Sequence, residues 1–134
     1  MMKHIAILLA FLMTLSSPVA AQDLREWFLR GSDYHYGHGV PQDYAEAAKW
    51  FRLAAEQGYT DAQFFLGLVY QDGKGVLQDN VMAHMWYNIT SANGDAIAGG
   101  LRDEIAKEMT SADISKAQAM ARECMNSGYS KCGY

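Results

Sequence analysis

The sequence repeats itself with a period of 36 residues. Residues 28–63 align with residues 64–99 without a gap, and twelve of the 36 positions are identical. A repeat of this length is typical of a solenoid, in which one unit cannot bury its apolar face alone and must stack on its neighbours. The identical pairs are Phe28 with Phe64, Gly31 with Gly67, Tyr34 with Tyr70, Gly37 with Gly73, Gly39 with Gly75, Val40 with Val76, Gln42 with Gln78, Asp43 with Asp79, Ala47 with Ala83, Trp50 with Trp86, Gly58 with Gly94 and Ala62 with Ala98.

The apolar residues of each unit have helical spacing. Positions i, i+3, i+4, i+7 and i+8 form one stripe along a helix that faces a core. Three segments show this spacing, so each unit is predicted to contain two helices. The stripes are Ala62, Phe65, Leu66, Val69 and Tyr70; Tyr44, Ala47, Ala48, Phe51 and Ala55; and Met82, Met85, Trp86 and Ile89.

Glycine and aspartate mark the ends of these helices. A glycine that tolerates the left-handed conformation is expected to end the first helix of each unit, and an aspartate to cap the next helix. The turn glycines are Gly37 and Gly39 in the first unit and Gly73 and Gly75 in the second, and the caps are Asp43 and Asp79. Gly58 and Gly94 are expected to end the second helices.

Gly31 and Gly67 lie inside predicted helices, where glycine costs about 1 kcal/mol relative to alanine. We expect close approach of another helix to compensate for this cost.

The third unit, residues 100–134, is degenerate. A helix is predicted from Ala96 to about Lys107, and its stripe contains Ile97, Leu101 and Ile105. Thr110 has the sequence context of an N-cap for a last helix. The stripe of that helix comprises Ile114, Ala117, Ala121 and Cys124. The predicted fold is therefore all-α, an α/α solenoid of two clear units plus a degenerate C-terminal capping pair.

Residues 1–21 have the layout of a secretory signal peptide. A short basic start precedes an 11-residue apolar run, Ile5 to Leu15, and small residues permit cleavage after Ala21. The run is too short to span a bilayer. We expect a single mature domain, residues 22–134, in the periplasm or outside the cell.

The net charge argues against one class of partner, and the two cysteines indicate a disulfide. The formal charge is −4 with no run of Lys or Arg, which argues against nucleic-acid binding. Two cysteines in an exported protein favour a disulfide between Cys124 and Cys132. The alternative is that Cys124 is simply a small buried residue.

Candidate ligands for a metal occur at His35 and His38, near Asp33. These residue types suit zinc. The second unit has Gln71, Lys74 and Val69 at the equivalent positions, whereas the surrounding glycines and tyrosine recur. The comparison favours an exposed turn over a metal site.

No nucleophile has a recognisable catalytic context, and His84 pairs with Ala48 of the first unit. Trp50 and Trp86 could stack a ligand, but their equivalent helical positions favour core packing. No cofactor is expected.

Polar and apolar residues off the main stripe of each first helix form a possible partner face. They either pack between units or bind a protein. These residues are Trp27, Phe28, Ser32, Gln63, Phe64 and Gln71.

At the segments "GSDYHYGHGVPQDYAEAAKWFRLAAEQGYTDAQ" and "LGLVYQDGKGVLQDNVMAHMWYNITSANGDAIA", the sequence resembles the Sel-one-like repeat (SLR) family of tetratricopeptide-like α/α solenoids. Two departures are Arg30 in place of the usual leucine, and Thr90-Ser91 in place of an alanine pair. The resemblance strengthens the Cys124–Cys132 pairing, because cysteine-containing members bridge at this spacing.

The resemblance also implies a function. Most members are non-catalytic adaptors that hold a partner protein or peptide, and many bacterial ones are exported. A few relatives bind or weakly hydrolyse penicillin-type, cell-wall-like ligands, which is the alternative. A metal binder using His35 and His38 is the third possibility. The expected role is a non-catalytic, exported, protein-binding adaptor.

Overall fold

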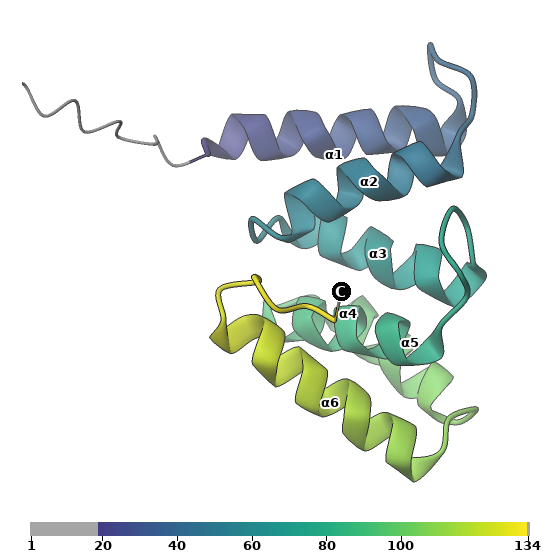
Figure 1. Ribbon diagram of the computed structural model, residues 1–134, viewed down its shortest axis with the longest axis vertical. Helices are drawn as coiled ribbons and strands as arrows, with labels where there is room; N and C mark the ends of the chain where they lie inside the picture. Colours follow the sequence, from purple (N-terminus) through teal and green to yellow (C-terminus); the bar gives the residue numbers. More distant parts are fainter. Residues whose placement is uncertain (1–18, 134) are drawn as a thin grey trace, which may run out of the picture.

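A computed structural model describes residues 19–133, so most of the predicted signal peptide lies outside the described part. The described residues form six α-helices and no strand (Figure 1). The helices are α1 (Ala21–Tyr36), α2 (Tyr44–Ala55), α3 (Thr60–Asp72), α4 (Asn80–Ala92), α5 (Ala96–Ala106) and α6 (Ser111–Asn126).

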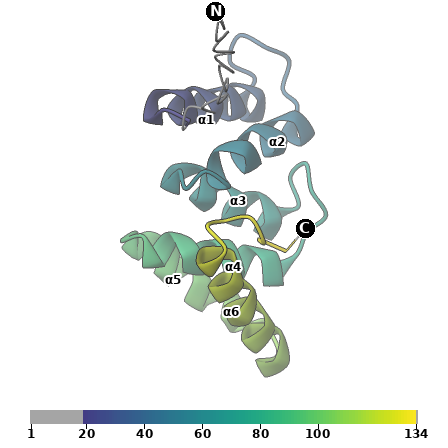
Figure 2. The same ribbon diagram turned by 60° about the vertical axis from the view of Figure 1, so that its left-hand side comes forward.

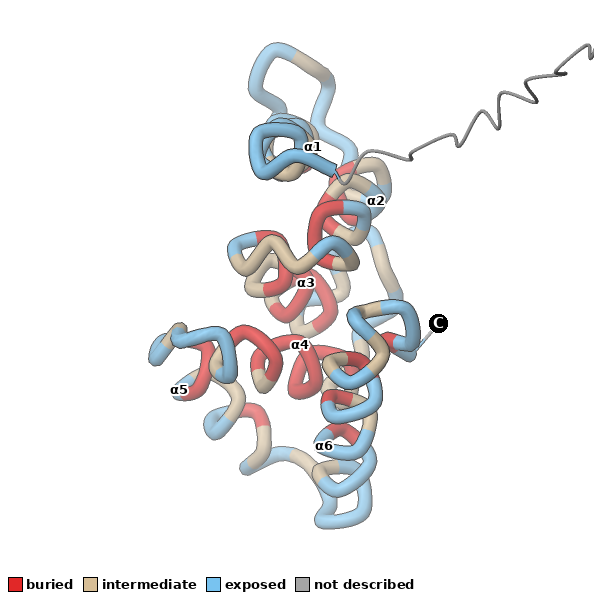
Figure 3. The backbone as a smooth tube through the Cα atoms, turned by 90° about the vertical axis from the view of Figure 1, so that its left-hand side faces the viewer, coloured by how far each residue is buried: buried red, intermediate tan, exposed pale blue. Residues whose placement is uncertain are grey.

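The helices stack in two columns. α1 packs on α2 and α3 packs on α4 as hairpins, and α2 packs on α3 to join the two units. The odd-numbered helices form one side of the stack, whereas α2 and α6 lie on the other (Figure 3). The predicted α/α solenoid is confirmed.

The two glycine turns have the same backbone geometry. Gly37 and Gly73 cap α1 and α3 in the left-handed region, with φ of 71° and 65°. The backbone N–H of Asp43 donates to Tyr34 O, and that of Asp79 to Tyr70 O, each at 2.9 Å. Both aspartates cap the following helix through their side chains. The recurring residues of the turn therefore specify its conformation.

The second glycine of each turn has different surroundings in the two units. A Cβ at Gly75 would overlap the backbone of Tyr44, the first residue of α2, whereas a Cβ at Gly39 would have nothing within 4 Å. The turn of the second unit therefore packs directly on the start of α2. Gly75 is thus required by contact between the units as well as by the turn, and the sequence predicted only the turn.

The glycines after the second helices differ in their distance from the helix end. Gly94 directly follows Asn93, the C-cap of α4, whereas Gly58 lies two residues beyond Glu56, the C-cap of α2. Both adopt positive φ, 89° at Gly58 and 102° at Gly94. Glycine therefore belongs to the turn after each helix, and α2 itself ends earlier than Gly58 indicates.

The recurring alanine of each second helix lies in the first turn of α2 and α4. Ala47 and Ala83 are both fully buried. Their backbone N–H groups donate to Asp43 O and Asp79 O, each at 3.0 Å. A Cβ at Gly31 would lie 3.3 Å from Ala47 O, so α1 passes close to this part of α2. A small residue therefore suits this buried position in both units.

Gly31 and Gly67 allow the two helices of each hairpin to come close. A Cβ at Gly31 would lie 2.6 Å from the Phe51 ring. At Gly67 it would overlap the ring of Tyr87, which is the residue equivalent to Phe51. Packing of an aromatic ring on each glycine thus compensates for the helix propensity that these glycines give up.

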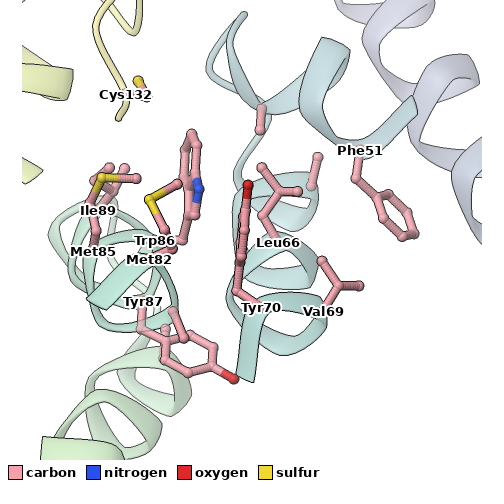
Figure 4. Close-up of a cluster of buried hydrophobic side chains, with 14 of the residues drawn as sticks. Phe51, Leu66, Val69, Tyr70, Met82, Met85, Trp86, Tyr87, Ile89 and Cys132 are labelled. Carbon is pink, nitrogen blue, oxygen red and sulfur yellow. The ribbon is translucent and has the colours of Figure 1, made fainter. Parts of the chain in front are cut away.

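The core is centred on α4. Eight of its 13 residues are buried, among them Trp86 and Tyr87. Tyr70 of α3 faces Trp86 of α4 inside this core (Figure 4). Thr90, which takes the place of Ala54 of the first unit, is also buried. Its hydroxyl donates to Trp86 O at 2.8 Å.

Trp50 differs from its equivalent Trp86. Trp86 is fully buried, whereas Trp50 is half-buried, with the Arg30 guanidinium 5.0 Å from its ring centroid. The prediction of core packing holds for Trp86 but only in part for Trp50. The difference arises because α4 carries both α5 and α6, whereas α2 has no helix in the place that α6 takes.

The terminal pair does not form a hairpin like the first two. α5 and α6 each pack on α4 and diverge from one another (Figure 2). The Thr110 hydroxyl accepts from Asp113 N at 3.1 Å, as expected of the cap. In α5, however, Ile97 is exposed and Ala98 is buried, so the predicted stripe is wrong at its first residue. The repeat explains the difference, because Ile97 takes the position of the exposed Asp61 and Ala98 that of the buried Ala62.

A disulfide joins Cys124 at the end of α6 to Cys132, with 4.4 Å between the Cα atoms. Both cysteines are buried. After α6 the chain turns back toward α4 (Figure 1). The bridge therefore fixes the C-terminal segment against the core.

The face of α1 at the end of the stack is polar. Its residues Glu26, Arg30 and Asp33 correspond to Ala62, Leu66 and Val69 in α3, which are buried against the preceding unit. No helix of the described chain covers this face of α1, so charged side chains replace the apolar ones. Terminal units of solenoids have a polar end face of this kind, because no further unit covers them.

Candidate functional site

The outer face of the odd-numbered helices is a surface that the repeat builds from equivalent positions. In α1 and α3 it is the side turned away from Gly31 and Gly67, the residues that face the hairpin partner. Residues at the same repeat positions continue it on α5. This outer face comprises Arg25, Leu29, Ser32 and Tyr36 of α1; Asp61, Phe65, Leu68 and Asp72 of α3; Ile97, Leu101 and Glu104 of α5; and Glu108 in the turn after α5.

Apolar side chains run along the middle of the outer face. Leu29 is 46% exposed and Ile97 is 69% exposed. Phe65, Leu68 and Leu101 are partly buried against the core and keep part of their surface outside it. Exposed apolar side chains with polar neighbours are characteristic of interaction sites.

The polar residues of the outer face are mainly acidic. Four of them carry carboxylates and only Arg25 carries a positive charge. Lys107 at the edge of the face pairs with Glu104 at 2.8 Å. The outer face therefore presents apolar side chains flanked by negative charge.

Most of the residues that the sequence suggested as a partner face take part in packing. Gln63 is fully buried: its amide donates to Ala55 O at 3.1 Å and accepts from Asn93 at 2.9 Å. Gln71 accepts from the Tyr87 hydroxyl at 2.6 Å. Both glutamines therefore join neighbouring helices.

The aromatic members of that set also contact the core. Phe28 packs against Phe51, Tyr59 and Phe65, with ring centroids 5.4–5.8 Å apart. Phe64 packs against Phe65 and Tyr87. Trp27 is partly buried against the core, and Ser32 is half-buried on the outer face itself.

Sequence reasoning did not single out Leu29, and it placed Phe65, Ile97 and Leu101 in buried stripes. The 36-residue period carries the missing signal. Extending it by one more unit places Leu29, Phe65 and Leu101 at equivalent positions, one on each odd-numbered helix.

The two histidines of the first turn lie in aromatic surroundings. His35 is half-buried, and its ring centroid lies 4.7 Å from that of Tyr36 and 5.0 Å from that of Tyr44. His38 stacks on Tyr36, with 5.6 Å between the ring centroids. Burial lowers the pKa of His35, and the nearby Lys74 lowers it further. Within residues 19–133, no three His, Cys, Asp or Glu side chains gather as a metal site requires.

His84 is buried in α4, and its Nδ1 has no hydrogen-bond partner among the described residues. Burial lowers its pKa, with a further contribution from Arg102. An imidazole without an orienting partner lacks the arrangement of a catalytic triad.

None of the helices between residues 19 and 133 has the length and apolar character needed to cross a membrane.

Comparison with known proteins identifies the repeat. A family model described as "Sel1 repeat" matches residues 28–59 and 60–95, which together make up half of the chain. The second match begins at Thr60, the first residue of α3. A comparison with curated proteins finds no match.

Among solved structures, the chain is similar to c5321, a protective antigen present in uropathogenic Escherichia coli strains that displays an SLR fold. The TM-score is 0.74 and the sequence identity is 31%. The match covers 79% of this chain and 24% of that chain, so this chain spans about a quarter of the length of c5321. Two matched tandem units and a shared solenoid show that the chain belongs to the Sel1 repeat family.

Proposed function

We propose that this protein is a non-catalytic adaptor that holds a partner protein or peptide on the outer face of α1, α3 and α5. The Sel1 repeat family and the SLR fold suggest a protein-interaction scaffold. The observation that carries the proposal is the line of apolar side chains Leu29, Phe65 and Leu101, with the exposed Ile97 beside it, which the repeat places on the three odd-numbered helices.

The charge of the outer face indicates the kind of partner. Its carboxylates, Asp61, Asp72, Glu104 and Glu108, flank the apolar line. A complementary segment has apolar side chains interspersed with Lys or Arg. Electrostatic attraction of this kind mainly accelerates association and selects among partners, while the buried apolar contacts supply affinity.

The non-catalytic part of the proposal rests on the nucleophiles and bases that the described residues offer. Both cysteines are in the disulfide, so neither is a free thiol. The Nδ1 atom of His84 has no hydrogen-bond partner among the described residues that would orient the ring.

We further propose that the protein acts in the periplasm or outside the cell. The disulfide supports this location, because such bonds persist in oxidising compartments. The layout of residues 1–21 as a signal peptide supports it from the sequence. Edman sequencing of the protein recovered from the envelope fraction tests it: a start at Gln22 supports export, and an intact Met1 in the cytosolic fraction contradicts it.

The adaptor proposal is tested with a matched pair of variants. Leu29→Ser alters the outer face, and Leu53→Ser alters α2 at a leucine of nearly equal exposure, 46% against 45%. Tagged protein is used to recover partners from envelope extracts, and the recovered proteins are quantified by mass spectrometry. We expect Leu29→Ser, and more strongly Leu29→Ser/Ile97→Ser, to lose a partner that Leu53→Ser retains. Equal recovery by all variants would contradict the proposal.

A further inference from the structure

A second surface, on the opposite side of the stack, is hollowed. A cavity of about 490 Å³ lies where α2, the turn between α3 and α4, α6 and the C-terminal segment meet. Pockets that bind small ligands have volumes of this order. The cavity shares none of its residues with the outer face.

Two cations from different helices line this cavity. Arg52 comes from α2 and Lys116 from α6, and Arg52 Nη2 donates to the Tyr70 hydroxyl at 3.1 Å. The lining contains one acidic residue, Asp79, whose Oδ1 already accepts from two backbone N–H groups at the start of α4. Glu56, one turn beyond Arg52, offsets part of its charge. Within the lining itself, two cationic side chains face one carboxylate, which is already engaged in capping α4.

The remaining wall of the cavity is apolar. Leu77 in the turn is 89% exposed, and Val76, Met82 and Met120 also line the cavity. An exposed leucine beside a cationic pocket suits a ligand that has both an apolar group and a carboxylate.

The disulfide completes the wall. Gly133 lines the cavity and lies against Met82 and Met120, since a Cβ there would be 2.6 Å from Met120 Cε. Its neighbour Cys132 is buried and bonded to Cys124. The C-terminal segment is thus held in place, and the cavity has a built wall.

We propose that this cavity binds a short acidic peptide segment, with carboxylates directed to Arg52 and Lys116 and an apolar side chain against Leu77 and Met120. The site is separate from the outer face and has the opposite charge preference. A single adaptor would then hold a basic-apolar segment on one side and an acidic-apolar segment on the other.

The test uses three synthetic probes on the disulfide-bonded protein: acetyl-Leu-Glu-Leu-Glu-amide, its glutamine analogue and its lysine analogue. Binding is followed in two-dimensional ¹⁵N–¹H NMR spectra. We expect the glutamate peptide to shift resonances of Tyr70, Leu77 and Met120. We expect affinity to fall as salt is raised, because the contacts are charged and partly exposed. The other two peptides are expected to leave those resonances in place.

Charge variants provide the control. Lys116→Gln and Arg52→Gln are each expected to weaken binding by roughly fivefold or more, as for the loss of one charge-assisted contact. Lys49→Gln, on α2 but outside the lining, is expected to leave affinity unchanged. Lys116 is exposed, so its variant keeps the test valid even if Arg52→Gln disturbs the contact with Tyr70. The absence of shifts at millimolar glutamate peptide, equal binding of the glutamine peptide, or shifts confined to the outer face would each overturn the proposal.

Discussion

Replacing Gly67 by alanine is expected to destabilise the protein, although alanine is the better helix former. Gly67 lies inside α3, and a Cβ there would overlap the ring of Tyr87 on α4. That ring has little room to move, because Tyr87 is fully buried and its hydroxyl donates to Gln71 at 2.6 Å. Alanine therefore forces the two helices of the hairpin apart.

The expected change in the free energy of unfolding of Gly67→Ala follows from two opposing effects. Replacing a glycine inside a helix by alanine normally stabilises by about 1 kcal/mol. Overpacking a core costs about 1–3 kcal/mol, and a rigid, hydrogen-bonded ring places Gly67→Ala near the upper end. The expected net loss is about 1–2 kcal/mol. The control is Gly100→Ala in α5, where nothing lies within 4 Å of the added Cβ, so a gain of about 0.5–1 kcal/mol is expected.

Urea denaturation followed by circular dichroism and tryptophan fluorescence measures both free energies of unfolding. Adding Tyr87→Val to Gly67→Ala should recover part of the loss, because residues in contact do not act additively. If Gly67→Ala stabilises the protein as much as Gly100→Ala does, the close approach of α3 and α4 is not what requires glycine at this position.

Three further changes test other contacts. Cys124→Ala/Cys132→Ala should cost about 2–3 kcal/mol of unfolding free energy, the value for a small loop on the chain-entropy model; equal urea midpoints for oxidised and reduced protein would count against it. Because burial lowers the pKa of His84 in the folded state, the folded protein resists protonation there, and stability should fall as pH drops through the usual histidine value of 6.5 and below. His84→Ala introduces the residue that the first unit has at this position, Ala48, and should flatten that pH dependence in urea titrations at several pH values. An unchanged slope would assign the pH dependence to other groups. Asp79→Ala should cost about 1 kcal/mol because it removes the acceptor for Val81 N and Met82 N, and an unchanged melting temperature would refute its role as a cap.

The repeat alone predicted most of the fold. The turn glycines and the capping aspartates recur because each unit forms the same turn and the same helix start. Comparing the two copies therefore separates residues that the turn requires from residues that can vary. The same comparison explains why Gly31 and Gly67 are paired with Phe51 and Tyr87. It could not show that Gly75 also contacts the start of α2, because that contact joins two units.

Sequence reasoning was least informative where the repeat ends. The helices of residues 96–126 were predicted, but not that α5 and α6 would diverge around α4. Apolar spacing shows that a helix has a buried face and does not show which neighbour covers it. The partial exposure of Trp50 follows from that arrangement. The burial of Ala98 in place of Ile97 follows the repeat instead, because Ala62 is buried and Asp61 is exposed at the equivalent positions.

The candidate sites depended even more on tertiary packing. Gln63 looked like a surface residue in the sequence, yet two hydrogen bonds allow it to be buried between units. The cavity beside Arg52 is built from segments more than 60 residues apart, whose proximity no local pattern encodes.

Photo-crosslinking in living cells tests the central claim most directly. A benzophenone side chain is placed in turn at Leu29 and Ile97 on the outer face, and at Leu53 on α2 as the exposed control. After irradiation, adducts are detected by a tag on this protein and identified by mass spectrometry. The proposed function predicts the same partner adduct from Leu29 and Ile97 and none from Leu53. An adduct from Leu53 alone, or no adduct from either outer-face position, would contradict it.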